Sequence, residues 1–79
     1  MEITLIDLSV GDEAEIAGYN TNDEIYRKKI LSMGLTRGTT VKLVKLAPLG
    51  DPVELLVRGF HLSLRKDEAS SLILRRKQS

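Results

Sequence analysis

Cysteine and tryptophan are absent from the sequence, and its aromatic residues are limited to one Phe and two Tyr. Without cysteine the chain can form neither a disulfide nor a thiolate metal site, and it has no cysteine nucleophile. This composition fits a reducing compartment. Because aromatic side chains are so scarce, the hydrophobic core has to be built from Leu, Ile and Val.

Long hydrophobic runs are also missing, since the apolar stretches are far too short to span a bilayer. The N-terminus has an acidic residue, Glu2, where a signal peptide would carry basic ones. These features predict a cytoplasmic protein with no direct membrane insertion. The formal net charge of +1 is too balanced to indicate a nucleic acid or an anionic membrane as partner.

The rest of the composition is typical of one small folded domain. Seventy-nine residues, of which 42% are hydrophobic and 29% charged, allow one domain with one modest core. The chain shows no repeat, linker or low-complexity segment. We therefore expect a single domain over residues 1–79, with the polar residues 75–79 as a frayed tail.

Alternating apolar and polar residues predict several short antiparallel strands. Residues 13–19 alternate, and three further apolar runs, 41–46, 53–57 and 60–64, are separated by a loop and a tight break. A last strand is expected at residues 72–74, closing the sheet near residues 3–8, which form a short strand or a single turn. In the run 60–64 the residues expected to face inward are Phe60, Leu62 and Leu64.

The run 41–46 changes phase midway. Val41 and Leu43 share one face of a strand, but Val44 and Leu46 share the opposite face. Either the strand is buried on both sides, or a bulge or bend switches the faces. Small barrels need such bends to close, so we favour the bend.

A helix is predicted to begin at Thr21. Thr21 followed by Glu24 three residues later forms a capping box, and acidic residues at this end suit the helix dipole. The helix is expected to run to about Met33, with Tyr26, Ile30 and Met33 on one apolar face.

Glycine marks the end of this helix. Gly34 stands where a left-handed cap is needed, and Leu35 can fold back on Ile30, the usual apolar contact of such a cap. Gly38 then marks a turn before the next strand. Together the elements predict a mainly β domain with a helical insertion. We expect a small barrel of about five strands, with one helix after the first long strand and a short helical turn before the last.

The order of several segments resembles the FeoA family. The segments are Ile-Leu-Ser-Met-Gly-Leu-Thr-Arg-Gly at 30–38, Ala-Pro-Leu-Gly-Asp-Pro at 47–52, Val-Arg-Gly at 57–59 and Leu-Ser-Leu-Arg-Lys-Asp-Glu-Ala at 62–69. With the opening residues 8–16, the match covers nearly the whole chain. The resemblance implies an SH3-like barrel and a small cytoplasmic accessory protein of bacterial ferrous iron uptake. Its implied partner is the FeoB-type membrane transporter, whose cytosolic part carries a GTPase domain.

Catalytic and metal-binding chemistry has little support in the residues. The acidic pairs at 23–24 and 67–68 sit at helix starts, where the helix dipole explains them. His61 is the only imidazole and is expected to face outward, whereas ferrous sites usually use two imidazoles and a carboxylate. Gly34 and Gly38 lack the Gly-Lys-Ser/Thr ending of a phosphate-binding loop. We therefore expect no enzyme activity, no cofactor and no metal site.

Partner binding is better supported, by one loop and one strand. Leu49 lies at a loop tip stiffened by two prolines, so the loop loses little entropy when it docks, and Leu56 is expected on the outer face of the next strand. Together they can form one exposed apolar patch. In the alternative, Leu49 covers a barrel end and Leu56 packs under the helix. The candidate partner-binding residues are Pro48, Leu49, Gly50, Asp51, Pro52 and Leu56.

Two other functions remain open at this point. Barrels of this kind also occur as the C-terminal domain of metal-dependent repressors, so the chain can be read as a peptide- or regulator-binding module. The basic triplets at 27–29 and 75–77 allow a nucleic-acid-binding barrel, although the aromatic residues that stack on bases are nearly absent. Outer-face leucines and unpaired edge strands also leave self-association open.

Overall fold

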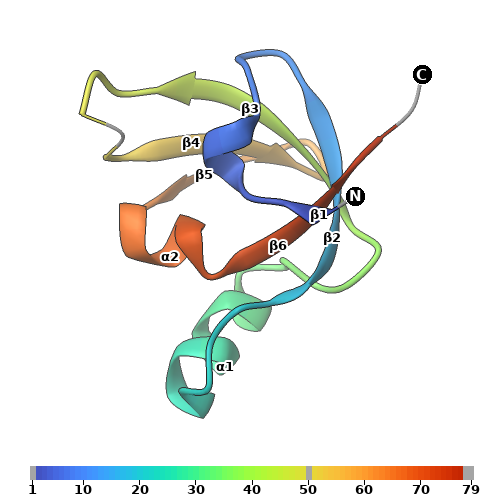
Figure 1. The fold of residues 1–79 in the computed structure, drawn as a ribbon, viewed down its shortest axis with the longest axis vertical. Coiled ribbons are helices and arrows are strands. Elements are labelled where there is room, and N and C mark those ends of the chain that lie inside the picture. The colour runs from blue at the N-terminus through green and yellow to red at the C-terminus, as the bar shows by residue number, and fades with distance from the viewer. Residues whose placement is uncertain (1, 50, 78–79) are drawn as a thin grey trace.

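The computed structural model describes residues 2–49 and 51–77 and shows one curved antiparallel sheet with two short helices (Figure 1). The strand order is β1-β6-β2-β3-β4-β5. This arrangement confirms the mainly β fold with a helical insertion, with six strands instead of about five. The elements are β1 (Glu2–Ile3), the 3-10 turn η1 (Leu5–Asp7), β2 (Glu13–Tyr19), α1 (Glu24–Ser32), β3 (Thr40–Leu46), β4 (Val53–Val57), β5 (Phe60–Leu64), α2 (Lys66–Ser70) and β6 (Leu72–Arg76).

The inside of the curved sheet is filled by aliphatic side chains, as the scarcity of aromatics predicted. Strands β2 to β6, both helices and η1 each contribute to this core. Helix α1 projects from the lower end of the molecule (Figure 1) and contributes the buried Ile30. No helix in the described part of the chain is long and apolar enough to cross a membrane.

Strand β3 contains the predicted bulge. Leu43 lies opposite Leu55 of β4, but Lys45 lies opposite Glu54, so Val44 is the extra residue. Beyond the bulge Leu46 lies opposite the buried Val53, on the same face of the sheet, and at the end of its strand it is 41% exposed. The bulge bends β3 and turns its end toward the rim of the barrel.

Two sequence expectations about the strands are wrong. Phe60 was expected inward but is 73% exposed, because it follows a two-residue turn at the start of the edge strand β5, where no further strand covers it. Residues 75–79 were expected to be a frayed tail, yet β6 continues to Arg76. The guanidinium of Arg76 donates to Asp12 Oδ2 and to the Asp7 carbonyl, each at 3.0 Å, and these bonds hold the strand end. Residues 78–79 lie outside the described residues.

The helix start is a third correction. The N-cap of α1 is Asp23 and not Thr21, and Glu24 is the first helical residue. Asp23 Oδ1 accepts hydrogen bonds from the backbone N–H groups of Ile25 at 3.0 Å and Tyr26 at 3.3 Å. Thr21 Oγ1 accepts instead from the Asp23 N–H at 3.2 Å, so it forms a turn before the helix. Thr and Asp are both favourable N-cap residues, and the course of the chain from β2 into the helix places Asp23 at the cap position.

The end of α1 depends on a left-handed glycine. Met33 is the C-cap, and Gly34 follows with φ of +89°. Leu35, the next residue, is fully buried, and its carbonyl accepts a hydrogen bond from the Tyr19 hydroxyl at 2.6 Å. Gly38, with φ of +84°, makes the turn into β3.

Replacing Gly34 by valine is expected to lower the free energy of unfolding by about 1–2 kcal/mol or more. A Cβ at this position meets nothing within 4 Å, so the cost comes from the positive φ alone. Gly34→Asn is the matched control, because asparagine adopts this conformation more readily. Urea unfolding of both variants measures the difference, and equal loss in the two would contradict a conformational origin.

Candidate interaction surface

The loop between β3 and β4 is held against α2 by its polar groups. The Asp51 carboxylate accepts a hydrogen bond from the backbone N–H of Lys66 at 3.2 Å, at the start of α2. Within the loop, the Ala47 N–H donates to the Pro52 carbonyl at 3.3 Å. Pro48 and Pro52 are exposed, and Gly50 lies outside the described residues. These bonds fix the base of the loop, so Leu49 is presented by an ordered frame.

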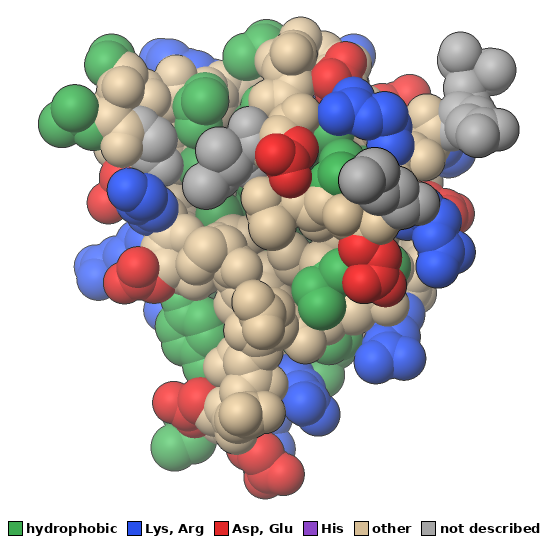
Figure 2. All heavy atoms as spheres, viewed as in Figure 1, with side chains coloured by type: hydrophobic (Ala, Val, Ile, Leu, Met, Phe, Trp, Pro, Cys, Tyr) green, Lys and Arg blue, Asp and Glu red, His purple; other side chains and the backbone are tan. Residues whose placement is uncertain are grey.

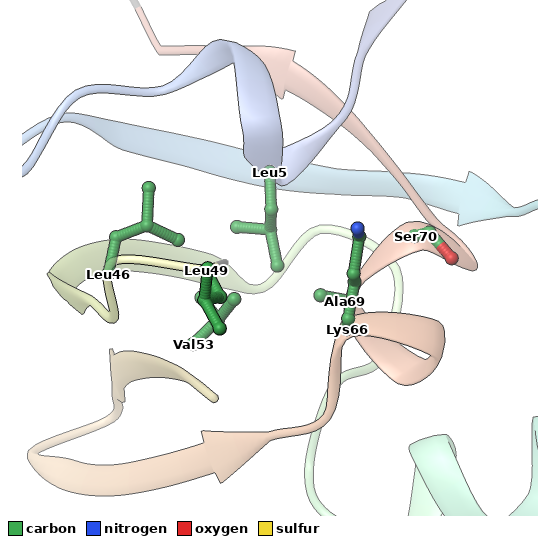
Figure 3. Close-up of a pocket in the computed structure, with 7 residues that line it drawn as sticks. All are labelled: Leu5, Leu46, Leu49, Val53, Lys66, Ala69 and Ser70. Atoms are coloured by element: carbon green, nitrogen blue, oxygen red, sulfur yellow. The ribbon is translucent and has the colours of Figure 1, made fainter. Parts of the chain in front are cut away.

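Leu49 lines an apolar groove at the end of the barrel (Figure 3). The groove has a volume of about 220 Å³. Its floor is made of buried side chains from η1, β4 and α2, and its rim of Leu46, Leu49 and the polar ends of α2 residues. In Figure 3, Leu5 points toward Leu49 and Val53, and the α2 residues lie across from them. The lining residues are Leu5, Leu46, Leu49, Val53, Lys66, Ala69 and Ser70.

Leu49 is 87% exposed, the most exposed of the large hydrophobic residues in the described part of the chain. Figure 2 shows hydrophobic side chains at the upper left of the molecule, over the tip of the β3–β4 hairpin, with basic side chains close by. Leu49 is therefore an apolar side chain left in contact with solvent at the rim of the groove.

Leu56 does not join Leu49 in one patch, so that prediction is wrong. Val53, Leu55 and Val57 are buried, and the strand period of two places Leu56 on the opposite face of β4, where it is half-buried between Lys42 and His61 of the neighbouring strands. Leu49 instead borders the groove floored by Val53. Leu49 lies at the barrel end, as the alternative interpretation of the sequence had it, but its side chain is exposed and does not cover that end.

The sequence analysis did not predict several of the residues that line the groove. Leu5, Ala69 and Ser70 come from η1 and α2, far from the loop in sequence, and no local pattern marks them as its neighbours. Leu46 could have been found, because the phase change in the run 41–46 predicted the bulge, and this bulge brings Leu46 opposite Val53 of the groove floor.

An ion pair between the buried Glu68 of α2 and the exposed Lys29 of α1 connects the two helices. Glu68 is 5% exposed, and its carboxylate lies 2.8 Å from Lys29 Nζ of α1 while also accepting from the Arg65 backbone N–H at 2.9 Å. The hydrogen bond from Lys29 and the one from Arg65 lower the pKa of Glu68 and outweigh its burial, which acts in the opposite direction. The carboxylate therefore has a structural role: Oε1 caps α2, and Oε2 forms the ion pair with Lys29 of α1.

Asp12, Tyr26 and His61 do not come together in one site. Asp12 is held by the Ser9 N–H at 3.0 Å and by Arg76, and these bonds lower its pKa. Burial raises the pKa of the Tyr26 hydroxyl, which has no hydrogen-bond partner in the described chain. His61 is exposed. Within residues 2–49 and 51–77, no group of three or more His, Asp and Glu side chains is placed to hold a metal ion.

The comparison with known proteins identifies the family. Residues 3–76 match the family described as FeoA domain. The chain belongs to this family. The FeoA domain is also 37% identical over 68 residues to an Fe(2+) transport protein A/Fe(2+) transporter FeoB fusion protein of Porphyromonas gingivalis. The match covers 86% of this chain, and the chain spans only 8% of the length of that relative.

Solved structures show the same fold. The FeoA-like protein from Clostridium acetobutylicum is 33% identical and superposes with a TM-score of 0.85, over 99% of this chain and 90% of that one. A manganese-dependent transcriptional repressor superposes with a TM-score of 0.86 over 96% of this chain and 42% of its own, at 12% identity. At that identity the likeness to the repressor shows a shared fold and nothing more.

Proposed function

We propose that this FeoA domain is a cytoplasmic accessory protein of ferrous iron uptake that docks on the cytosolic part of a FeoB-type transporter and catalyses no reaction itself. The observation that carries the proposal is the fusion relative, in which a segment similar to this chain and a FeoB transporter form one polypeptide. Covalent linkage of two proteins in one organism supports a working association between their separate counterparts.

The groove beneath Leu49 is the docking surface that we propose. Its buried floor and exposed apolar rim suit a leucine- or phenylalanine-sized side chain of the transporter, with Lys66 and Ser70 left for polar contacts at the edge. The hydrogen bond from Lys66 to Asp51 orders the loop base before binding, so little conformational entropy is lost on docking.

The two leucines that the sequence grouped together now provide a matched pair of variants. Leu49→Asp is expected to lower recovery of the full-length transporter in co-purification at least tenfold, because it places a charge in an apolar contact. Leu56→Asp, on the other face of β4, is expected to leave recovery unchanged wherever that variant stays folded.

The pair tests the surface and the partner separately. Equal recovery with wild type and a folded Leu49→Asp variant would remove the groove from the proposal. No recovery with wild type, with or without guanine nucleotide, would remove the transporter as direct partner. Circular dichroism of both variants confirms that a loss of capture is not a loss of fold.

A further inference from the structure

Strand β5 leaves one edge of the sheet without a partner strand. The strand order ends at β5, and all five of its residues pair with β4 on one side only. The opposite end of the sheet is β1, which has only two residues. No backbone hydrogen bond from another segment of the described chain reaches residues 60–64. β5 is therefore the long open edge of this barrel.

The turn before β5 determines which backbone groups face outward. Arg58 and Gly59 both have positive φ, +52° and +84°, which is the type I′ geometry of a two-residue hairpin. The turn makes Val57 and Phe60 the first hydrogen-bonded pair, and such pairs alternate along an antiparallel ladder. The N–H and C=O groups of His61 and Ser63 consequently point away from β4 and can receive another strand.

A groove runs beside this open edge. One hollow of about 470 Å³ is lined by Phe60 and Leu62 on the β5 side and by Met33 at the end of α1. A second hollow, of about 550 Å³, continues along Ser63 and Arg65 and shares Met33 with the first. The two together extend along the whole of β5, apolar at the Phe60 end and charged at the Arg65 end, with the end of α1 as the opposite wall.

The charges at this edge favour an acidic occupant. Arg58 stands just before β5 and Arg65 just after it, and both are exposed. The ion pairs of the described chain are Lys29–Glu68 and Arg76–Asp12, so neither arginine has a carboxylate partner. Arg58 donates only to the hydroxyls of Thr36 and Thr39, at 3.5 and 3.3 Å. The carboxylates that line the groove, Glu68 and Asp51, are already engaged.

The same charges disfavour a second copy of this chain as the occupant. Antiparallel pairing of two β5 strands about a twofold axis, with His61 opposite Ser63 of the other copy, would place Arg58 of one copy opposite Lys66 of the other and bring Arg65 next to that pair. Like charges placed directly opposite on paired strands are destabilising. An edge that carries a cation at each end instead complements a strand that carries an anion at each end.

We propose that β5 is the docking edge for an extended segment of another polypeptide, apolar in its middle and acidic at both ends, which adds to the sheet as a seventh strand. The backbone groups of His61 and Ser63 supply the hydrogen bonds, Met33 and Leu62 receive the apolar side chains, and Arg58 and Arg65 pair with the acidic ends. This edge is separate from the groove beneath Leu49, and the proposal does not rest on the identity of the transporter.

A synthetic peptide tests the edge directly. The probe is the acetylated and amidated heptapeptide Glu-Val-Thr-Val-Thr-Val-Glu, titrated into the full ¹⁵N-labelled chain at low salt and followed by NMR. We expect shifts confined to residues 29–34 and 57–66, together with slower exchange of the His61 and Ser63 amide protons. The same peptide with lysine at both ends is expected to bind about tenfold more weakly, since two charge pairs become repulsive.

Ser63 provides the decisive variant. Ser63→Pro removes an outward N–H, and proline is tolerated on an edge strand at such a position, so the variant should fold but lose peptide binding. Ser63→Ala keeps the N–H and should bind as wild type. A peptide N-methylated at alternate residues gives the same test without any change to the protein, should Ser63→Pro fail to fold.

Four results would overturn the proposal. The first is binding that survives both Ser63→Pro and N-methylation, and the second is no binding of the peptide at all. The third is a set of shifts centred on the groove beneath Leu49. The fourth is concentration-dependent dimerisation through β5 in the absence of peptide, measured by sedimentation. Leu49→Asp should leave peptide binding unchanged, which separates this edge from the docking surface proposed above.

Discussion

Replacing Leu55 by alanine is expected to lower the free energy of unfolding by about 2–5 kcal/mol. Leu55 is fully buried in β4, opposite Leu43 of β3 and Leu62 of β5, and truncation leaves a cavity in a core with no aromatic residue to fill it. A domain of this size has a total stability of about 4–12 kcal/mol, so the loss is a large fraction of the whole. Urea unfolding followed by circular dichroism measures it.

Leu56 is the control for this experiment. It is the same residue type, one position along the same strand, but it faces away from the core and is only half-buried. Leu56→Ala is expected to cost about 1 kcal/mol or less, because fewer contacts are lost. Equal losses for the two variants would mean that the assigned faces of β4 are wrong.

The second large effect is expected at Glu68. Glu68→Gln keeps an oxygen that can accept from the Arg65 N–H but removes the charge that pairs with Lys29. The variant is expected to be less stable than wild type by about 1–2 kcal/mol at neutral pH, since the buried carboxylate loses its ion pair with Lys29, whose own side chain is 57% exposed and so is partly screened by solvent. Lys28→Met, beside Lys29 on the exposed side of α1, is the matched control and should change stability little.

The stability difference between wild type and Glu68→Gln is expected to depend on pH in one direction. The pKa of Glu68 is lowered in the folded state from its ordinary value of 4.5. A lowered folded pKa contributes stability that is fully present above the unfolded pKa and is lost as pH falls through the folded pKa. The stability difference between wild type and Glu68→Gln should therefore be constant above about pH 5 and shrink steadily in more acidic solution.

Asp12 titrates in the same acidic range and also has a lowered pKa, because Ser9 and Arg76 hold its carboxylate. It is present in both proteins, so its contribution cancels in the difference. A difference between wild type and Glu68→Gln that stayed constant down to pH 2 would show that the Lys29–Glu68 pair does not stabilise the fold.

Much of the architecture could be predicted because it depends on short-range patterns. Alternation placed Ala14 and Ile16, and then Val53, Leu55 and Val57, on the buried faces of their strands, since side chains on a strand alternate between its two sides. The phase change between Leu43 and Val44 predicted the bulge for the same reason. A local period is readable in one sequence without knowledge of the partner strand.

The sequence predictions were wrong where two residues could play the same local role, or where a segment distant in sequence determines burial or order. Thr21 and Asp23 are both acceptable helix caps, and only the path of the chain from β2 selects Asp23. Phe60 has the phase of a core residue, but it lies beside the turn on an edge strand and has no neighbour to bury it. Arg76 lies in a polar stretch that is typical of a frayed tail. It is ordered by two hydrogen bonds to Asp7 and Asp12, which lie near the other end of the chain.

For the candidate site, the sequence alone was enough to place Leu49 between two prolines in a loop, because proline fixes its own φ angle and so restricts the loop locally. It also determined the alternation that separates Leu55 from Leu56. The surface that Leu49 borders could be known only from the folded chain, since Leu5, Lys66 and Ala69 reach the groove from η1 and α2, far from the loop in the chain. The open edge of β5 was decided in the same way. The strand order depends on pairing between segments that are distant in sequence. The residues of a strand therefore do not predict whether a second strand will pair with its other edge.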